Sequence, residues 1–332
     1  MFMRIGWFGF IIGFVALLYG GLWWYGKDTH PIHYGISFSS QHAAWLFSDW
    51  KKMYHDMLVD LKPPFVRLSV DWDQVETKEG VYDFSDIDFM MNEAKGSGAK
   101  VVLAIGQKTP RWPECHIPAW VLEKTSDEYT QQLYTYLTAT VDRYKNHPAL
   151  EYWQVENEPY IKFTFGNCEK FQKDILDQEI IIVHSHDSSH HIVITDSGEL
   201  AIWYPAAKKG DIFGTTMYRS VMSPRGGVFT YDWLPAGWYR ARAQVLGLSS
   251  DTFFISELQA EPWIHDGSVT STSIEEQFKT MSVEQMKKNL EFARHTTASR
   301  AYLWGVEWWY WMKYEKGDNS FVELAKKYIT QN

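Results

Sequence analysis

Short apolar runs recur along the chain from about residue 33 onward, and helical stretches lie between them. Runs such as VVLAI at 101–105 and HIVIT at 191–195 are apolar at nearly every position, which is typical of parallel strands buried on both faces. The pattern predicts eight strands, at His33–Ser39, Phe65–Val70, Lys100–Gly106, Leu150–Glu156, His191–Asp196, Asp211–Tyr218, Thr252–Glu257 and Ala301–Trp308.

Helical stretches follow most of these strands. Eight strands, each followed by a helix, predict an α/β fold of the (β/α)8 TIM-barrel type. No segment rich in proline, glycine or serine divides the pattern, so we expect a single barrel domain. The predicted helices are Trp50–Leu61, Asp86–Ala99, Asp127–His147, Lys170–Ser185, Ala236–Leu246, Ile274–His295 and Phe321–Ile329, with Ala201–Lys209 as a weaker candidate.

An uncharged stretch precedes the barrel pattern. Ile5 to Tyr25 spans 21 residues without a charge, or about 31 Å as a helix, which matches the hydrocarbon core of a bilayer. Aromatic residues at both ends suit the two membrane interfaces. We expect residues 1–27 to form a transmembrane signal anchor rather than a cleaved signal peptide, because no convincing small-x-small cleavage site is present. The barrel domain at 28–332 would then lie outside the cytoplasm.

Composition narrows the range of partners. The formal net charge is -9, from 32 Lys and Arg against 41 Asp and Glu, which makes the chain a poor candidate for binding nucleic acid. Two cysteines are too few for a disulfide framework or a four-cysteine zinc site. The 17 Trp, 19 Tyr and 19 Phe supply many flat faces that could stack on the apolar faces of sugars.

Two carboxylates lie at the ends of the predicted strands four and seven, and the active sites of such barrels lie at the strand ends. Strand four is followed by Asn157-Glu158-Pro159, and strand seven ends at Glu257. Both would face the same mouth of the barrel. Cleavage of a glycosidic bond needs two facing carboxyl groups, one protonated and one ionised. Glu156 and Glu261 lie nearby as rivals for these roles.

These residues resemble clan A of the glycoside hydrolases, the retaining (β/α)8 cellulase-like superfamily, over about residues 33–312. The resemblance implies that Glu158 is the general acid/base and Glu257 the nucleophile in a double displacement on an O-glycosidic bond. The segment at 80–88 is similar to the motif after strand two of the β-galactosidase-type and family 39-type branches.

The resemblance also implies roles around the two carboxylates. Asn157 would donate its amide to a sugar hydroxyl, Arg67 would contact the nucleophile, and Tyr218 would hydrogen-bond it. Trp308 and Trp309, at the end of the predicted strand eight, would form the floor of the subsite that holds the sugar to be cleaved.

The sequence departs from the family 5 pattern at two places. Thr216 stands where a histidine usually precedes the strand-six tyrosine, and Gly106-Gln107-Lys108 ends strand three without the histidine often found there. These positions contact substrate, so the resemblance assigns the clan and the reaction type, while the family and the preferred sugar stay open.

The loop after strand three carries further candidates. Trp112 could stack on a sugar, and Gln107 and His116 could bind hydroxyl groups; alternatively the loop is merely rigid. Cys115 in this loop and Cys168 in the next could form a disulfide outside the cytoplasm, or remain two buried thiols.

A histidine cluster has the spacing of metal ligands, at His184, His186, His190 and His191. It would lie on the face of the barrel away from the carboxylates, so a solvated turn is the preferred interpretation. No nucleotide-binding or metalloprotease motif is present in the sequence, and we expect no cofactor and no metal.

The leading hypothesis is therefore a membrane-tethered retaining glycoside hydrolase that acts on an oligo- or polysaccharide. Two alternatives stay open. One is a non-catalytic barrel that binds carbohydrate at the cell surface, which would have no need for both carboxylates. The other is a transglycosylase, which would use the same residues and pass the sugar to another sugar instead of water.

Overall fold

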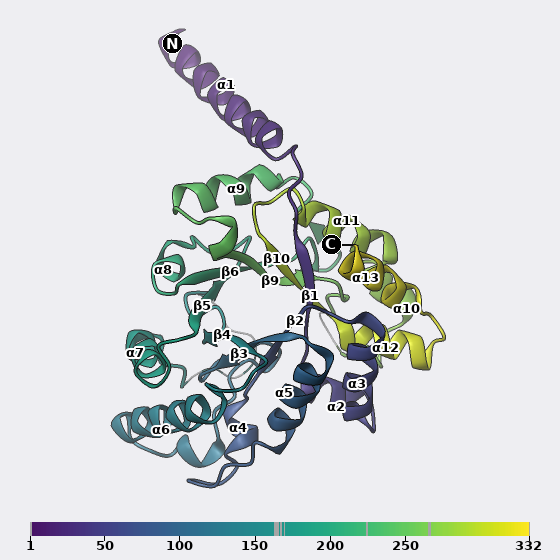
Figure 1. The fold of residues 1–332 in the computed structure, drawn as a ribbon. Helices are drawn as coiled ribbons and strands as arrows, with labels where there is room; N and C mark the ends of the chain where they lie inside the picture. Colours follow the sequence, from purple (N-terminus) through teal and green to yellow (C-terminus); the bar gives the residue numbers. More distant parts are fainter. Residues whose placement is uncertain are drawn as a thin grey trace.

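The computed structural model describes residues 2–162, 166, 168, 170–223, 225–264 and 267–331, and of residues 2–9 it describes only the helical backbone. Its centre is a closed barrel of strands in the order β1-β10-β9-β6-β5-β4-β3-β2, with every neighbouring pair parallel (Figure 1). The predicted (β/α)8 barrel is therefore confirmed. The strands are β1 (His33–Ser37), β2 (Phe65–Ser69), β3 (Lys100–Ile105), β4 (Leu150–Val155), β5 (His191–Asp196), β6 (Ile212–Met217), β9 (Phe253–Gln259) and β10 (Arg300–Trp304).

Helices surround this barrel, as Figure 1 shows. Helix α3 has the predicted ends, the other predicted helices have shifted ends, and one of them is divided in two. Helices α2, α4 and α12 were not predicted. A small antiparallel hairpin, β7 (Ser220–Met222) and β8 (Val228–Thr230), follows β6. The helices are α1 (Phe2–Tyr25), α2 (Ser40–Leu46), α3 (Trp50–Leu61), α4 (Trp72–Val75), α5 (Ser85–Ser97), α6 (Ser126–Tyr144), α7 (Leu176–His186), α8 (Tyr204–Ala207), α9 (Ala236–Val245), α10 (Ile274–Phe278), α11 (Val283–Ala293), α12 (Val306–Glu315) and α13 (Ser320–Thr330).

Two predicted boundaries are wrong. The last barrel strand ends at Trp304, and Gly305 starts α12 with φ of 131°, a value that residues with a side chain rarely adopt. The apolar run continues through this junction, so hydrophobicity alone did not reveal the change from strand to helix. The predicted helix Ile274–His295 is also broken, because the Ser282 side chain caps a new helix by accepting the N–H of Gln285.

The structure does not support the predicted transmembrane anchor at residues 1–27. Among the residues whose placement is described, no helix is both long enough and apolar enough to cross a membrane. The last turns of α1 contact α9: the Tyr25 hydroxyl donates to Gln244 at 2.7 Å, and Arg240 donates to the Tyr25 carbonyl at 2.6 Å. Gly237 permits this approach, because a Cβ there would lie 1.9 Å from the Leu22 carbonyl oxygen.

The inside of the barrel is packed with side chains. A small apolar cluster takes one residue from each of six strands and fills the interior. Arg300 lies over the Phe65 and Phe254 rings of this cluster and forms a bidentate ion pair with Glu151 at 2.6 and 2.8 Å. The members of the cluster are Phe65, Val102, Val193, Ile212, Phe254 and Tyr302.

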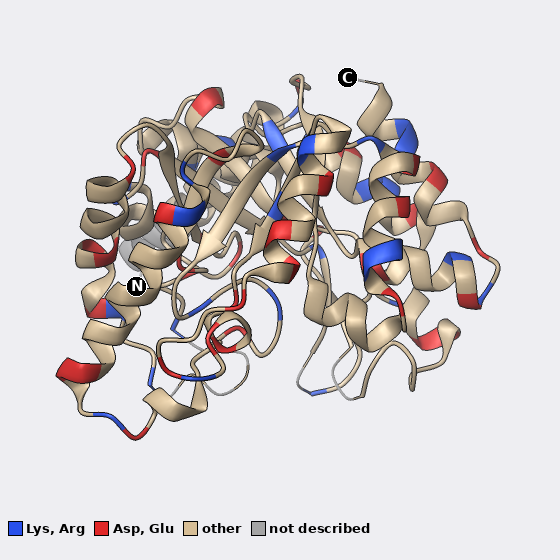
Figure 2. Ribbon diagram, turned by 60° about the horizontal axis from the view of Figure 1, so that its bottom comes forward, with Lys and Arg blue, Asp and Glu red and all other residues tan. Residues whose placement is uncertain are grey.

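Charged residues of both signs are interspersed over the outer helices (Figure 2). Many form pairs between neighbouring elements, such as Lys51 of α3 with Asp86 of α5 at 2.7 Å. Exposed pairs of this kind stabilise a fold only slightly. The more consequential charges lie inside the mouth of the barrel.

Candidate active site

The predicted nucleophile is held by residues from two other strands. Glu257 lies within β9 and is 4% exposed. Arg67 of β2 donates to one of its oxygens at 2.9 Å, and the Tyr218 hydroxyl, just beyond β6, donates to the other at 2.8 Å. A guanidinium and a phenol that both donate to a carboxylate stabilise its negative charge. The structure thus brings together the three residues that the sequence analysis grouped.

Arg67 also connects this carboxylate to the end of β4. It is fully buried, and it donates to the Gln154 side chain at 2.7 Å and to the Asn157 side-chain oxygen at 2.8 Å. Thr195 of β5 donates to the same Asn157 oxygen at 3.2 Å. With its oxygen held from two sides, the Asn157 side chain has a fixed orientation. Gln154 and Thr195 were not predicted, since their polar character is visible in the sequence but their inward direction is not.

The predicted acid/base occupies a different environment. Glu158 is 6% exposed and adopts a left-handed backbone with φ of 45°. Its backbone N–H donates to the Thr195 hydroxyl at 3.0 Å, and the Thr216 hydroxyl donates to its carboxylate at 3.1 Å. Thr216, noted as a departure from the family 5 pattern, therefore contacts the acid/base directly.

The two carboxyl groups have different electrostatic surroundings. Burial raises the pKa of Glu158 well above its usual range, the neighbouring Glu257 carboxylate raises it further, and the Lys108 ammonium opposes both. Glu257, in contrast, receives hydrogen bonds from a fixed cation and a phenol. The arrangement therefore favours a proton on Glu158.

The predicted aromatic floor is wrong in position. Trp308 and Trp309 belong to α12, are fully buried, and donate their indole N–H groups to Gln277 and to the Ala260 carbonyl, each at 2.7 Å. Their faces are therefore not available to a ligand. Trp304, the last residue of β10, occupies the end of the final strand instead. The error follows from the misplaced end of that strand.

A buried ionic group covers Trp304. The Arg111 guanidinium lies 4.2 Å from its ring centroid and pairs with both Glu261 and Glu307, the latter at 3.0 Å. Glu261, considered as a rival nucleophile, is thus engaged by Arg111. Burial raises the pKa of Glu307 to about 6, although the charge of Arg111 opposes this shift.

Gln107 and His116 do not point to the substrate side of the loop. Gln107 is fully buried: its side-chain oxygen accepts from Tyr129 at 2.7 Å and from the Gln172 N–H at 3.1 Å. His116 is 1% exposed and lies between Asp71 and Asp73, 3.3 Å from the latter. Both residues therefore hold the loop in place, and the assignment of these two to sugar binding is corrected.

Trp112 is the member of this loop that remains open to solvent. Its side chain is 57% exposed and contacts the equally exposed Trp45 of α2, with ring centroids 6.0 Å apart. The adjacent Arg111 and the nearby His42, three residues before Trp45, both reach the ionic group around Glu307. The two tryptophans thus form an aromatic ledge beside the mouth.

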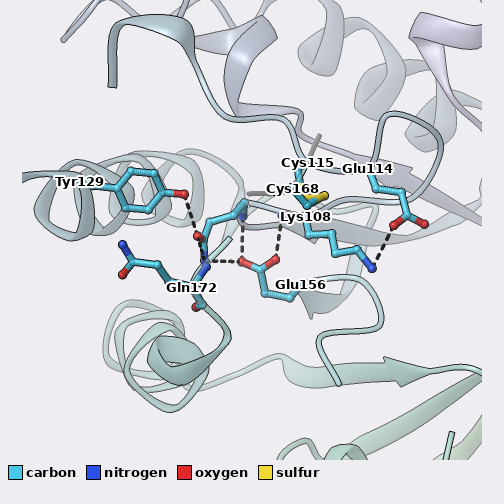
Figure 3. Close-up of a disulfide and its surroundings, with 8 residues drawn as sticks. Lys108, Glu114, Cys115, Tyr129, Glu156, Cys168 and Gln172 are labelled. Carbon is cyan, nitrogen blue, oxygen red and sulfur yellow. Dashed lines mark hydrogen bonds and ion pairs between the residues drawn. A yellow bond between two sulfur atoms is a disulfide. The ribbon is translucent and has the colours of Figure 1, made fainter. Parts of the chain in front are cut away.

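The two cysteines are joined. Cys115 after β3 and Cys168 after β4 form a disulfide with their Cα atoms 5.3 Å apart (Figure 3). The bond ties together the loops that follow two neighbouring strands. The loop that follows β4 also contains Glu158.

The histidine cluster does not converge on one point. His190 pairs with Asp187 at 2.7 Å, His186 with Asp142 at 3.1 Å, and His184 and His191 each with Asp211 at 3.5 Å or more. Over the described residues, one group has ligand atoms close enough for a metal ion: His42, Glu261 and Glu307. The Arg111 guanidinium already pairs with both of these carboxylates, so the group does not fit a metal ion.

We expect the buried His116 to make stability depend on pH. Burial lowers its pKa, but the charges of Asp71 and Asp73 outweigh burial and raise the pKa to about 9. The resulting stability, up to about 3 kcal/mol, should be complete below about pH 6.5 and lost as the pH rises through about 9. Urea unfolding of the wild type and His116→Gln from pH 6 to 10 measures this, and a constant difference between them would contradict it.

Comparisons with known proteins agree with the barrel fold. Residues 68–180 match the family described as Glycosyl hydrolase family 10, a segment that contains Glu158. A β-galactosidase from an Arthrobacter species is 33% identical over 111 residues, which cover 26% of this chain and 15% of that protein. The β-galactosidase LacZ of Heyndrickxia coagulans is 25% identical over 174 residues, which cover 44% of this chain and 24% of that protein. The chain thus spans a quarter or less of these relatives.

Solved structures share the fold at low identity. A β-galactosidase from the psychrophilic Marinomonas ef1 matches with a TM-score of 0.57 and 14% identity, covering 82% of this chain and 54% of that one. Xylanase 10B of Thermotoga petrophila RKU-1, solved with xylobiose, matches with a TM-score of 0.53 and 16% identity, covering 90% and 95%. These matches span several families, so no single family is assigned. Together, the family match and the shared barrel place the chain in clan A, the superfamily of (β/α)8-barrel glycoside hydrolases.

Proposed function

We propose that this protein is a retaining glycoside hydrolase that cleaves O-glycosidic bonds of an oligo- or polysaccharide. The observation that carries the proposal is the contrast between two buried carboxyl groups at one mouth. Glu257 is held by Arg67 and Tyr218 in a way that stabilises its charge, whereas burial and the Glu257 charge favour a proton on Glu158. Retaining glycosidases need this pair of states.

The reaction would proceed in two displacements. In the first, a Glu257 oxygen attacks the anomeric carbon, the bond to the leaving oxygen breaks, and Glu158 gives its proton to that oxygen. In the second, Glu158 takes a proton from water, whose oxygen attacks the anomeric carbon and breaks the bond to Glu257. Asn157, fixed by Arg67 and Thr195, would bind a hydroxyl of the sugar being cleaved.

Covalent trapping tests the proposal. Residues 1–332 would be incubated with 2-fluoro glycosides, including β-galactosyl and β-xylosyl reagents because the similar proteins include β-galactosidases and a xylanase. We expect a sugar adduct on Glu257 by intact mass and peptide mapping. An adduct on Glu156 or Glu261 would contradict the assigned nucleophile. Carbohydrate binding without any turnover or adduct would favour the non-catalytic alternative, and transfer to an added sugar acceptor would indicate a transglycosylase.

The aromatic ledge is proposed as a site for a second sugar ring. Trp45 and Trp112 are both more than half exposed at the mouth, although burial of such rings is usually favourable. We expect Trp112→Ala to raise KM about fivefold for an oligosaccharide and to change it little for an aryl monosaccharide, since one stacking contact is worth about 1 kcal/mol. Trp238→Ala, which removes an exposed tryptophan on α9, is the matched control. Equal effects on both substrates would contradict the ledge.

The disulfide supports a location outside the cytoplasm, which we propose on this ground. Disulfides persist in oxidising compartments and are rare in reducing ones. Protein recovered from its native cells under alkylating conditions should contain no free thiol at Cys115 or Cys168. Full alkylation of both residues would contradict the proposed location.

A further inference from the structure

A second buried carboxylate lies two residues before the acid/base. Glu156 is 1% exposed, and its two oxygens accept the backbone N–H groups of Gln107 at 2.8 Å and Lys108 at 2.7 Å (Figure 3). These N–H groups belong to the residues that follow β3. A carboxylate at the end of β4 thus accepts the backbone hydrogen bonds at the end of the neighbouring strand β3.

The backbone is shaped for this contact. Gly106 adopts φ of 130°, and a Cβ there would lie 2.4 Å from a Glu156 carboxylate oxygen. Glu156 itself has φ of 61°, a left-handed conformation that costs a residue with a side chain roughly 1–2 kcal/mol. Such conformations persist where surrounding contacts hold them. The close approach of Glu156 to this backbone is therefore a built feature of the site.

Two further bonds tie the same strand ends together. The N–H of Asn157 donates to the Lys108 carbonyl at 2.7 Å, which joins the catalytic segment directly to the residue that Glu156 holds. Farther along the two loops lies the disulfide between Cys115 and Cys168. Glu156 and Asn157 therefore bind Lys108 through its N–H and its carbonyl.

Lys108 carries its charge into the active site. Its side chain is 1% exposed, its ammonium lies 3.0 Å from a Glu114 carboxylate oxygen, and its charge acts on Glu158. Glu257, Glu114 and Asp196, which are all acidic, raise the pKa of Glu158. The charge of Lys108 thus opposes these three negative charges.

A neighbouring acid keeps the charge of Glu156 in place. Gln107 donates its side-chain amide to Glu179 at 3.2 Å and to Glu156 at 3.4 Å. Burial raises the pKa of Glu179 well above its usual range, and the nearby Glu156 raises it further. Burial raises the pKa of Glu156 as well, but its hydrogen bonds with Glu179 and with the N–H groups of Gln107 and Lys108 oppose this shift and favour the negative charge on Glu156.

We propose that Glu156 is a positioning residue, which clamps the end of β3 to the catalytic segment and so holds the Lys108 ammonium beside Glu158. This inference rests on the proposed role of Glu158 as the acid/base. The inference predicts the direction in which the pKa of Glu158 changes when Glu156 is replaced. Loss of the Glu156 charge alone would lower the pKa of Glu158, whereas release of Lys108 would raise it.

Titration of Glu158 separates these two effects without relying on activity. Carbon-13 NMR of protein labelled at the glutamate carboxyl carbons would follow Glu158, identified by the signal missing from Glu158→Gln. We expect Lys108→Met to raise the pKa of Glu158 by about one unit, as loss of a nearby opposite charge does. Glu156→Gln should raise it in the same direction, and the double variant should not exceed Lys108→Met alone.

The matched control is Glu76→Gln, which alters a fully buried carboxylate that accepts a backbone N–H, from Gly80, in the loop after β2. We expect it to lower stability without moving Glu158. Glu156→Asp, which keeps the charge but is too short for both N–H groups, replaces Glu156→Gln if that variant fails to fold. An unchanged or lowered pKa of Glu158 in the Glu156 variants overturns the inference.

Kinetics distinguish this outcome from failure of the proposed function. Glu156→Gln should lower kcat about tenfold with little change in KM, because the substrate contacts are kept while the pKa of Glu158 is shifted. A wild type that turns over no glycoside would overturn the proposed function, and the titration would still decide whether Glu156 holds Lys108. If the wild type is active and the pKa of Glu158 is unchanged in the Glu156 variants, only the positioning role of Glu156 is overturned.

Discussion

Replacement of Glu257 by glutamine is expected to lower kcat for an activated glycoside by about 10⁴-fold or more. The amide cannot form the glycosyl bond, and its oxygen carries no charge to stabilise the developing positive charge at the anomeric carbon. Arg67 keeps its bonds to Gln154 and Asn157, so the variant should fold. Circular dichroism and substrate depletion over hours would measure both effects.

A small external nucleophile provides the control for this prediction. Glu257→Ala leaves space beside the anomeric carbon, and azide should restore turnover with a product of inverted configuration. Glu261→Gln alters the rival carboxylate, which Arg111 holds. Full turnover by Glu257→Gln, or a larger loss in Glu261→Gln, would show that the nucleophile is misassigned.

Replacement of Glu158 by glutamine is expected to lower kcat/KM by about 10²–10⁴-fold, and more for poor leaving groups than for good ones. Glutamine has no proton to give, so substrates whose leaving oxygen needs one suffer most. A nitrophenyl glycoside and a natural disaccharide, compared in the same variant, measure the difference. Equal losses on both substrates would contradict the acid role.

The pH profile gives a second reading of Glu158. The residue acts protonated in the first displacement, and burial together with the Glu257 charge raises its pKa. Activity should therefore persist above the usual range of a carboxyl group and fall as the pH rises through the pKa of Glu158. Glu158→Gln has no group to titrate there and should lose this alkaline limb. A limb that remains in the variant would belong to another residue.

Much of the fold could be predicted from the sequence because parallel barrel strands are buried on both faces. β3 is apolar at every position after Lys100, and β5 has the apolar centre Ile192–Ile194, so their place in the chain is visible without any structure. Glu158 and Glu257 could be selected as candidates because the active sites of such barrels lie at the carboxyl ends of the strands. Arg67 and Tyr218 came from the resemblance, and the structure places both on Glu257.

The errors have a common physical cause. Trp308 is as apolar as the strand before it, and the turn at Gly305 that moves it into α12 depends on backbone conformation rather than hydrophobicity. Gln107 and His116 are polar residues in a loop near the mouth, which is also what a substrate-binding residue would look like in sequence. Their partners, Tyr129 and Asp71, lie on other elements of the fold.

The sequence by itself determined the barrel and the mouth that holds the two candidate carboxylates, because strand burial and chain order are local properties. Only the tertiary structure showed the other side chains around those carboxylates, such as Gln154, Thr195 and Lys108. Glu156 and Asn157 bind the Lys108 backbone only because β3 and β4 lie side by side, and Trp45 meets Trp112 only because the loops after β1 and β3 converge. Such contacts join residues distant in sequence, and their geometry arises when the barrel closes.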